Sequence, residues 1–430
     1  MRGYNGYYML IGSVLSAFLL TGCGYRVETE SVASPDATSP YDTNSYVGAM
    51  SMESAPIIDY TVPQMSSNIL VDLNGYPAYG KKEAAVKGSR LPETFAVVDA
   101  ATGEPVYYGE IAEPIYDEEL GLYTGSVDFS DFDREGNYYL ECDVIGRSYR
   151  FDIREDFYSG LFDDIYRQFL TSCKAGTLSV DDALDLLEVY EWYSDVFPDE
   201  DEDQVPDVLK ELKEWVSQKE ADGVEEGETT LYAACLAKFS YNYQKYERQY
   251  ATDCLKRAAT VFRQVQAATD NDADIFYALT ELYRATGLST YRNRIGGYKS
   301  FFVDNISCLE ESGYRSGAMT YMATRQRVDV DLCAAFMGEI MDRAEEISLQ
   351  CTDMIHPVSA KNNGAEDLLK QARWVSCANY VMNIYEYTNV IEEFLHYLMG
   401  RNLESVNIYA QGGEETGYLL LLAQMAANEL

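Results

Sequence analysis

The spacing of the apolar residues changes once along this chain, near residue 154. Between residues 68 and 154, short apolar runs end at turn residues, as Ile69–Leu73 ends at Asn74-Gly75. About seven such runs are typical of a β-sandwich of immunoglobulin type. From about residue 155 the apolar residues recur with the period of an α-helix, and strand-like alternation is nearly absent. The sequence therefore predicts an N-terminal immunoglobulin-like β-sandwich over 68–154 and an all-α domain over 155–430.

The helical part divides into about twelve segments joined by short connections. Pro206 begins one of them, in a position that suits proline at the first helical residue, and Val208, Leu212 and Trp215 share its apolar face. Gly287 follows another segment as a C-cap should. We expect helices at 159–171, 181–193, 206–219, 229–245, 250–266, 275–286, 298–311, 315–324, 329–348, 364–388, 390–400 and 415–428.

The N-terminus carries the pattern of an exported lipoprotein. The apolar run Met9–Leu20 is too short for a membrane span, which needs ~20 residues, but it suits the core of a signal peptide. Leu20-Thr21-Gly22-Cys23 then forms a lipobox, in which the Cys23 sulfur receives a diacylglyceryl group. Two acyl chains suffice for stable anchoring. We expect residues 1–22 to be removed; the alternative is an ordinary secretory signal with an incidental cysteine.

Residues 23–67 are predicted to be the lipidated cysteine and a flexible tether. The segment is rich in Ser, Thr, Pro, Ala and Asp and has no sustained period, so it cannot bury enough apolar surface to offset its ordering entropy. A flexible linker of about 43 residues reaches roughly 35–40 Å. We therefore expect the protein to be extracytoplasmic, held by its lipid at the outer face of the bacterial cell membrane.

The charge excludes several partners. The formal net charge of −38 argues against nucleic acid and against docking to anionic lipid. The acidic run 199–203 lacks EF-hand spacing and a turn glycine, so a solvated loop is a better interpretation than a cation site.

Apart from Cys23, the cysteines show no C-x-x-C spacing and are interpreted as buried thiols, with one or two disulfides left open. We expect neither a metal nor a cofactor.

Several segments resemble the family 9 glycoside hydrolases, which pair an immunoglobulin-like domain with an (α/α)6 barrel. Each segment is short, but together they follow the family's order over residues 69–428. The resemblance implies an (α/α)6 barrel over 155–430 with short loops at its active face, and a β-glucan or another polysaccharide as possible partner. The segments are Ile69–Pro77 with Lys81, Asp128–Ser130, Gly136–Tyr138, Gly146–Phe151, Tyr158 with Tyr166–Phe169, Val205–Glu211 with Trp215, Glu281–Gly287 with Tyr291, Trp374–Asn379 and Tyr397–Asn402.

The catalytic motifs of that family are largely missing. Family members are inverting enzymes that act on β-1,4-glucans, and their catalytic base lies in an Asp-Ala-Gly-Asp loop after Gly-Trp, between the first two barrel helices. Here that loop is 174–182, which has neither motif, although it contains Asp181 and Asp182. These two residues are candidate bases, but their interpretation as acids in the first turn of the next helix is preferred, because acids there favour the helix dipole. The family's His-Arg segment has no room in 403–413.

The remaining candidates come from the same comparison. The general acid of the family is a Glu just before the last barrel helix, where Glu414 and Glu415 stand without the usual flanking Asn residues. Trp374 and Tyr409 are candidates for binding substrate, since sugars stack on aromatic faces. The two histidines match no family position: His396 is interpreted as a packing residue, and His356 lies in a predicted loop.

Three functions stay open from the sequence. The first is a non-catalytic surface lipoprotein that binds glycan or supports a polysaccharide-handling assembly, motivated by 37 tyrosines, although these could simply be half-buried helix residues. The second is an inverting hydrolase with a rearranged site that uses Glu414 or Glu415 with Asp181. The third is a structural or protein-docking body. The sequence identifies no protein partner.

Overall fold

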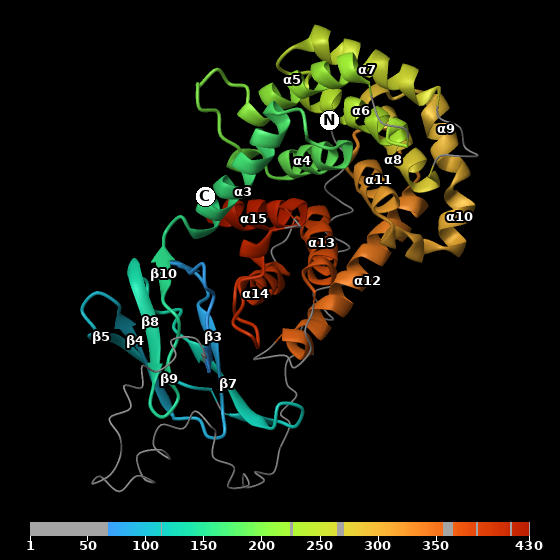
Figure 1. The fold of residues 1–430 in the computed structure, drawn as a ribbon. Helices are drawn as coiled ribbons and strands as arrows, with labels where there is room; N and C mark the ends of the chain where they lie inside the picture. The colour runs from blue at the N-terminus through green and yellow to red at the C-terminus, as the bar shows by residue number, and fades with distance from the viewer. Residues whose placement is uncertain are drawn as a thin grey trace, which may run out of the picture. The chain divides into compact units, whose positions relative to one another are not determined.

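The computed structural model describes residues 68–430, apart from residue 113, the segments 224–226, 265–270, 356–363, 384–385 and 413–414, and residue 430. The described residues all belong to one compact unit, Pro40–Leu430. Cys23, the signal peptide and the tether lie outside the described residues, so those predictions stay predictions. Figure 1 shows strands followed by helices, in the predicted order.

The first described part is a sandwich of two β-sheets. One sheet has the strand order β1-β3-β7-β6, and the other has the order β2-β10-β8-β4-β5, with β9 paired to β8. Only β2 and β10 pair in parallel among these strands. The strands are β1 Ile69–Leu70, β2 Tyr76–Pro77, β3 Glu83–Gly88, β4 Thr94–Asp99, β5 Pro105–Glu110, β6 Ile115–Asp117, β7 Leu122–Asp128, β8 Gly136–Cys142, β9 Gly146–Arg147 and β10 Phe151–Arg154.

Alternating apolar residues give the sandwich its core. In β4, Phe95 and Val97 are buried and lie opposite Cys142 and Leu140 of β8. Gly109 of β5 faces Phe95, because a Cβ at this position would come within 2.4 Å of the Phe95 ring. Two inward-facing rows of this kind, one from each sheet, enclose a continuous apolar cluster. The sandwich fold and its position before the helices are confirmed.

The second part is helical from α3 to α15. Three short 3₁₀ segments, η1 Ser194–Val196, η2 Ile306–Glu310 and η3 Tyr409–Gln411, interrupt the series. The α-helices are α3 Phe157–Lys174, α4 Val180–Trp192, α5 Asp207–Asp222, α6 Thr229–Tyr243, α7 Arg248–Phe262, α8 Asp272–Thr286, α9 Ser289–Gly297, α10 Lys299–Asp304, α11 Ser312–Ala323, α12 Val330–Ile355, α13 Ala365–Met382, α14 Thr388–Leu398 and α15 Glu415–Glu429.

Six of these helices form a closed inner ring. In the order α4, α6, α8, α11, α13 and α15, each packs against the next, and α15 returns to α4 (Figure 1). The helices between them pack outside, as α7 does on α6 and α8 and α12 does on α11 and α13. Because return helices separate them along the chain, the inner helices run the same way and their N-terminal ends gather at one end of the ring. This arrangement confirms the predicted (α/α)6 barrel.

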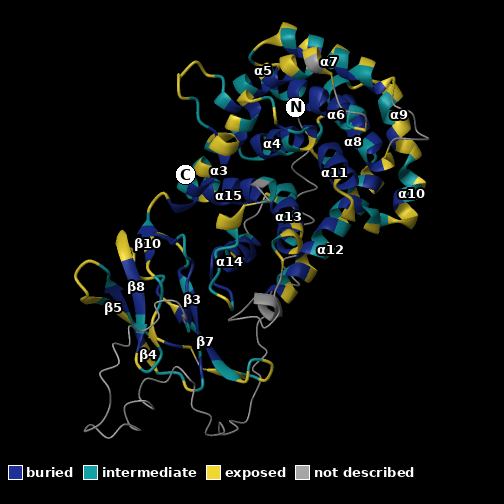
Figure 2. Cartoon of the chain, in the orientation of Figure 1, coloured by how far each residue is buried: buried dark blue, intermediate teal, exposed yellow. Residues whose placement is uncertain are grey.

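The inner helices are largely buried on all sides, as Figure 2 shows for α4, α6 and α8. Within α6, for example, the run Ala233–Ser240 is buried throughout. A helix that is buried all round belongs to the middle of a large domain. Among the described helices, none is both long enough and apolar enough to cross a membrane.

Several predicted boundaries were wrong. The segment expected at 298–311 divides at Asn305 into α10 and η2. The segment expected at 364–388 ends at Met382, because Asn383 takes a left-handed conformation with φ 51°. Pro206 is the N-cap of α5 and Asp207 is its first residue. Helix α9 was not predicted, since Ile295 is its one buried residue and it therefore lacks an apolar stripe.

Candidate functional site

Charged side chains of the inner helices meet inside the ring, each near the middle of its helix or toward its C-terminal end. Arg373 on α13 reaches α4, where its Nη2 lies 2.9 Å from Asp185 Oδ1 and 2.6 Å from Glu188 Oε1. Because α13 and α4 are not neighbours in the ring, these pairs cross its interior. Lys238 Nζ on α6 lies 3.1 Å from Glu281 Oε1 on α8. We define the lumen cluster as Asp185, Glu188, Glu191, Lys238, Glu281, Arg284 and Arg373.

Every carboxylate of the lumen cluster has a cationic partner. Arg373 binds both Asp185 and Glu188. Glu281 accepts from Lys238, from Arg284 Nη2 at 2.6 Å and from the Thr320 hydroxyl at 2.8 Å. Glu191 pairs with Arg284, and its Oε2 lies 3.6 Å from Lys238 Nζ. The cluster is therefore a network of buried and partly buried ion pairs.

The electrostatics keep Glu191 and Lys238 charged. Burial disfavours the charge on Glu191, but Arg284 and Lys238 outweigh it and lower its pKa to about 2. Burial alone would lower the pKa of Lys238, yet Glu281 and the neighbouring acids raise it well above its ordinary value. A carboxylate with a pKa near 2 is a poor proton donor at neutral pH. Glu191 thus joins α4 to α6 and α8 through its ion pairs and does not offer an acid.

Asp181 and Asp182 lie in the first turn of α4, as the sequence allowed. The Ser179 hydroxyl accepts a hydrogen bond from the Asp182 backbone N–H at 3.0 Å and donates to Asp182 Oδ2 at 2.7 Å. This is the geometry of an N-cap, and it accounts for Asp182 as a structural residue. Asp181 is exposed. Its pKa is raised, mainly by desolvation and to a smaller extent by the negative charges of Asp185, Glu228 and Asp182.

The connection between α3 and α4 offers no other carboxylate. It runs through residues 175–179, with Gly176 in the left-handed region at φ 69°. Lys174, at its start, pairs with Glu211 at 3.3 Å, and the Thr177 hydroxyl donates to the Ser172 carbonyl at 3.3 Å. These side chains tie the turn to the neighbouring helices. Asp181 and Asp182 are therefore the acids that this connection leads into.

The other sequence candidates that the structure describes, Trp374 and Tyr409, contact different residues. Trp374 on α13 is only 2% exposed, and the guanidinium carbons of Arg315 and Arg343 lie 5.1 and 5.9 Å from its ring centre. Tyr409 in η3 is half-buried against Tyr418, with ring centres 4.9 Å apart, and burial raises its pKa to about 12. Glu414 lies outside the described residues. Glu415 is the first residue of α15, and its side chain is likewise not described.

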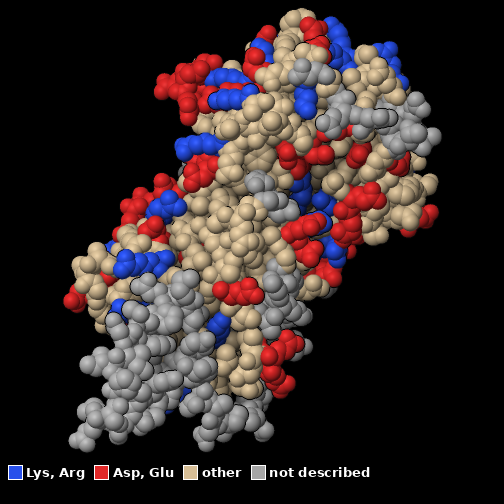
Figure 3. Space-filling model, viewed as in Figure 1, with Lys and Arg blue, Asp and Glu red and all other residues tan. Residues whose placement is uncertain are grey.

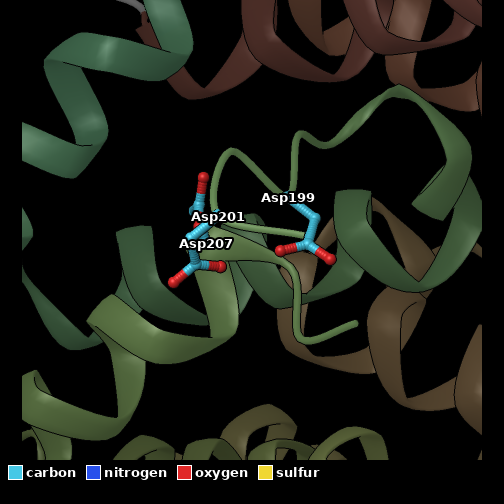
Figure 4. A group of neighbouring side chains, drawn as sticks. All are labelled: Asp199, Asp201 and Asp207. Atoms are coloured by element: carbon cyan, nitrogen blue, oxygen red, sulfur yellow. The ribbon is translucent and has the colours of Figure 1, made fainter. Parts of the chain in front are cut away.

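The acidic run at 199–203 is an exposed loop, as predicted, but it has an internal cation. Figure 4 shows Asp199, Asp201 and Asp207 close together. The Lys210 ammonium lies 3.3 Å from Asp199, 2.9 Å from Asp203 and 3.1 Å from Asp207, and it also contacts Asp201. These carboxylates could hold a metal ion by their spacing, but Lys210 already supplies the positive charge.

The thiols and one histidine are also located. All eight cysteines after Cys23 are free, six of them buried and Cys308 and Cys333 partly exposed, so the described structure forms no disulfide. His396 is buried on α14 beside Tyr76, as a packing residue would be. Its Nδ1 lies 2.7 Å from Asp72 Oδ2 of the β-sandwich, a pairing that the sequence did not reveal. His356 lies outside the described residues.

Comparison with known proteins agrees with this architecture. Residues 64–147 match the family model of the cellulase N-terminal ig-like domain. A metagenome-derived family 9 endoglucanase is 17% identical with a TM-score of 0.63, and the match covers 79% of this chain and 84% of that one. The chain has the fold of a family 9 cellulase.

Two further solved structures share this cellulase-like fold. A family 9 protein from Bacteroides ovatus is 14% identical with a TM-score of 0.62, and the match covers 84% of this chain and 99% of that chain. A thermostable endoglucanase from Alicyclobacillus acidocaldarius is 15% identical with a TM-score of 0.60, covering 80% of this chain and 84% of that one. No curated protein sequence matches the chain.

Sequence reasoning missed the lumen cluster, although one signal was present. Lys238 follows the small, apolar run Ala233–Ala237, and such a charge on a helix buried all round needs a partner. Glu281 and Arg284 stood within a segment already noted for its resemblance to the cellulase family. What the sequence could not show is that α4, α6, α8 and α13 bring these charges to one place.

Proposed function

We propose that this protein is a non-hydrolytic, cellulase-like lipoprotein that binds β-glucan chains at the outer face of the bacterial cell membrane. In this role the barrel retains the frame of a polysaccharide-binding enzyme without the groups that cleave the chain. The observation that carries the proposal is the pairing of every carboxylate in the lumen cluster with Lys or Arg. Acids held in this way stabilise the barrel.

The chemistry of inversion explains why this pairing matters. An inverting glycosidase needs a protonated carboxyl that gives its proton to the leaving oxygen and a second, ionised carboxyl ~6.5–9.5 Å away that activates water. Glu191, with a pKa of about 2, cannot be the proton donor. The α3–α4 connection supplies no carboxylate before the first turn of α4. Both points support binding without turnover.

The glycan preference rests on likeness and on aromatic residues. One similar structure is described as a complex with a cellobiose-like isofagomine, which is a property of that protein. Tyr409, half-buried in the connection that leads into α15, lies at the end of the ring where the inner helices begin, and we assign it to the glycan surface. A stacked sugar ring needs an aromatic face of this kind.

Titration calorimetry of the full chain in detergent with cellohexaose tests the proposal. We expect saturable binding with no new reducing ends after prolonged incubation. Tyr409→Ala should weaken binding by about tenfold, which is the loss of ~1.4 kcal/mol. Tyr116→Ala, an exposed tyrosine on β6, is the matched control and should bind as the wild type does. Absence of binding to cello-oligosaccharides and to cell-wall glycans would rule the function out.

The lipid anchor is tested separately. The wild type should fractionate with membranes and incorporate labelled fatty acid, whereas Cys23→Ala should do neither. Recovery of the wild type in the soluble fraction, without label, would contradict the anchored location. This outcome would leave the binding measurements on the purified chain unaffected.

An active hydrolase is the alternative, and one observation favours it. The pKa of Asp181 is raised, at the ring end where the inner helices begin. If Glu414 or Glu415 is the acid and Asp181 is the base, reducing ends should accumulate, and the activity should disappear in Glu414→Gln, Glu415→Gln or Asp181→Asn. Lack of activity in the wild type on every β-glucan tested would reject this alternative.

A further inference from the structure

The side chains on the lumen face of α4 become less exposed with distance from the start of the helix. Asp181, Asp185 and Glu188 follow one another at spacings of four and three residues, so they lie on one face of α4. Asp181 is exposed, whereas the side chain of Asp185 is 30% exposed and that of Glu188 is 3% exposed. Both Asp185 and Glu188 contact Arg373 across the ring. This face therefore looks into the lumen, and solvent reaches Asp185 from the end where the inner helices begin.

Lys238 and Glu281, which lie deeper in the lumen, are almost fully buried. They stand near the middle of α6 and α8, and their side chains are 2% and 0% exposed. The side chain of Arg373, which reaches Asp185 from α13, retains 15%. The partly exposed pair of Asp185 and Arg373 therefore lies between an open end and a closed centre. We define these two residues as the lumen floor.

The lumen floor has hydrogen-bonding groups that its own ion pair does not use. Arg373 contacts both acids through Nη2, which lies 2.9 Å from Asp185 Oδ1 and 2.6 Å from Glu188 Oε1. Among the described residues, Asp185 Oδ2 accepts no hydrogen bond, and Nε and Nη1 of Arg373 donate none. A carboxylate acceptor and guanidinium donors thus stand side by side, and hydrogen bonds to charged groups are the strong ones.

Tyr277 on α8 adds a hydroxyl beside the lumen floor. The residue is buried, and Lys238 Nζ lies 5.6 Å from the centre of its ring. Burial, together with the nearby acids Glu188, Glu281 and Asp185 and against the opposing charge of Lys238, raises the pKa of Tyr277 well above its ordinary value. The hydroxyl therefore keeps its proton, and it forms no hydrogen bond with a described residue. A buried hydroxyl without a partner is costly, so a ligand hydroxyl at this place would be bound favourably.

The charges around the lumen floor favour an uncharged ligand. The lumen cluster contains four acids and three cations. Arg315 on α11 is buried and close enough to Glu188 and Asp185 to interact with their charges, so it supplies a fourth cation. A carboxylate, sulfate or ammonium group on the ligand would add a charge without a partner to this balanced set, which is costly in a buried place.

We propose that Asp185 and Arg373 bind two neighbouring hydroxyl groups of one uncharged sugar unit of the glycan. One hydroxyl donates to Asp185 Oδ2, the next accepts from Arg373 Nε or Nη1, and the Tyr277 hydroxyl offers a further donor. The inference rests on the proposed glycan binding and narrows it to uncharged chains whose adjacent hydroxyls are free. The lumen floor is then a specificity-determining part of the glycan surface.

Titration calorimetry of the full chain in detergent tests this inference with two probes, cellohexaose and cellohexaose methylated at its 2- and 3-hydroxyls. The wild type should bind the methylated chain about tenfold more weakly. In Asp185→Asn, Arg373 holds the amide oxygen, so an NH₂ group replaces the free acceptor Oδ2. This variant should bind cellohexaose about tenfold more weakly and discriminate less between the two probes.

Glu191→Gln is the matched control, because it breaks an ion pair of the same helix and the same cluster without touching the lumen floor. It should bind both probes as the wild type does. Arg373→Lys keeps a positive charge between Asp185 and Glu188 but lacks the guanidinium fork, so it should discriminate less, as Asp185→Asn does. This second variant serves if Asp185→Asn does not fold.

The outcomes separate this inference from the proposed function. Cellohexaose binding with full discrimination in Asp185→Asn or Arg373→Lys would overturn the role of the lumen floor and leave glycan binding standing. Equal binding of both probes by the wild type would do the same. A wild type that binds no glycan at all would reject the proposed function and this inference with it.

Discussion

At the scale of single residues, the stability of this barrel depends on buried charged side chains. Lys238 is 1% exposed, yet it faces three carboxylates on two helices. Removing one partner of such a pair leaves an uncompensated charge in a dry interior, which costs far more than the pair itself contributes. The consequence is that the lumen cluster tolerates joint replacement better than single replacement.

Lys238→Met should lower the free energy of unfolding by about 3–5 kcal/mol, because Glu281 loses its ammonium partner while it remains buried. Lys213→Met is the control. It removes a partly exposed pair with Glu247 and should cost less than about 1 kcal/mol. Urea titrations followed by circular dichroism measure both. Equal losses of unfolding free energy in the two variants would mean that the lumen cluster contributes no more to stability than a partly exposed ion pair.

Acid should unfold the protein through the same groups. The pKa of Glu191 and of Glu393 is about 2, against an ordinary 4.5, because despite burial each faces Arg and Lys. A carboxyl whose pKa is lower in the folded than in the unfolded protein stabilises the fold above its unfolded pKa. This stabilisation is present above about pH 4.5 and is lost towards pH 2, by about 3 kcal/mol for each group. Melting temperatures from pH 6 to 2 should fall steeply, and less steeply in Glu191→Gln.

Single residues also show how much of the structure could be predicted from the sequence. The first-turn position of Asp182 was predicted from local rules, and the cap formed by Ser179 obeys the same rules although it was not predicted. The burial of His396 was expected from its apolar neighbours, but Asp72 lies on the other domain and no local pattern points to it. The spacing of residues along the sequence cannot reveal partners that only the fold brings together.

At the scale of elements, the end of α14 depends on a close approach of backbones. Gly400 has φ 133°, which residues with a side chain rarely adopt. A Cβ there would come within 2.5 Å of Leu73 Cγ and 3.1 Å of the Val71 carbonyl oxygen. The glycine lets the segment after α14 lie directly against the first strand region of the sandwich.

Gly400→Ala should therefore destabilise the chain by about 1–3 kcal/mol, from backbone strain and from the clash with Leu73. Gly296→Ala is the counterpart. This glycine lies in α9 with open space around its Cβ position, so alanine should be neutral or slightly stabilising. Thermal melts of the two variants give the comparison, and similar losses in both would contradict the packing argument.

The period of the apolar residues predicted most of the helices, because most of the helices bury one face. The prediction failed for helices that do not bury a face. Helix α9 lacks an apolar stripe and was missed. The break at Asn383 was missed because a left-handed residue leaves the surrounding composition unchanged. The closed ring itself was inferred from resemblance, since periodicity determines which face is buried and not which helix covers it.

At the scale of the whole molecule, the two domains should unfold together. All three tryptophans, Trp192, Trp215 and Trp374, lie in the barrel, while Cys142 is buried in β8 of the sandwich. Tryptophan fluorescence and thiol labelling of Cys142, followed by mass spectrometry, therefore report on separate domains. At pH 5 we expect one denaturant midpoint for both probes. Clearly separated midpoints would show that the interface does not couple the domains.

Acidic side chains outnumber basic ones in this chain, with 71 Asp and Glu against 33 Lys and Arg. Figure 3 shows them distributed over the visible face, with basic groups between them. A net charge of −38 keeps such a molecule soluble, but it also makes close contact between copies costly at low salt. A surface of this sign attracts cations from the medium, and any loop that depended on them would vary with the medium's composition.

The loop around Lys210 avoids that dependence. Its counter-ion is covalently part of the chain, so it can be neither diluted nor chelated. The order of this loop should therefore be the same in hard water, in soft water and in the presence of EDTA. Lys210 gives this part of the protein a constancy that metal-stabilised loops obtain only where calcium is supplied.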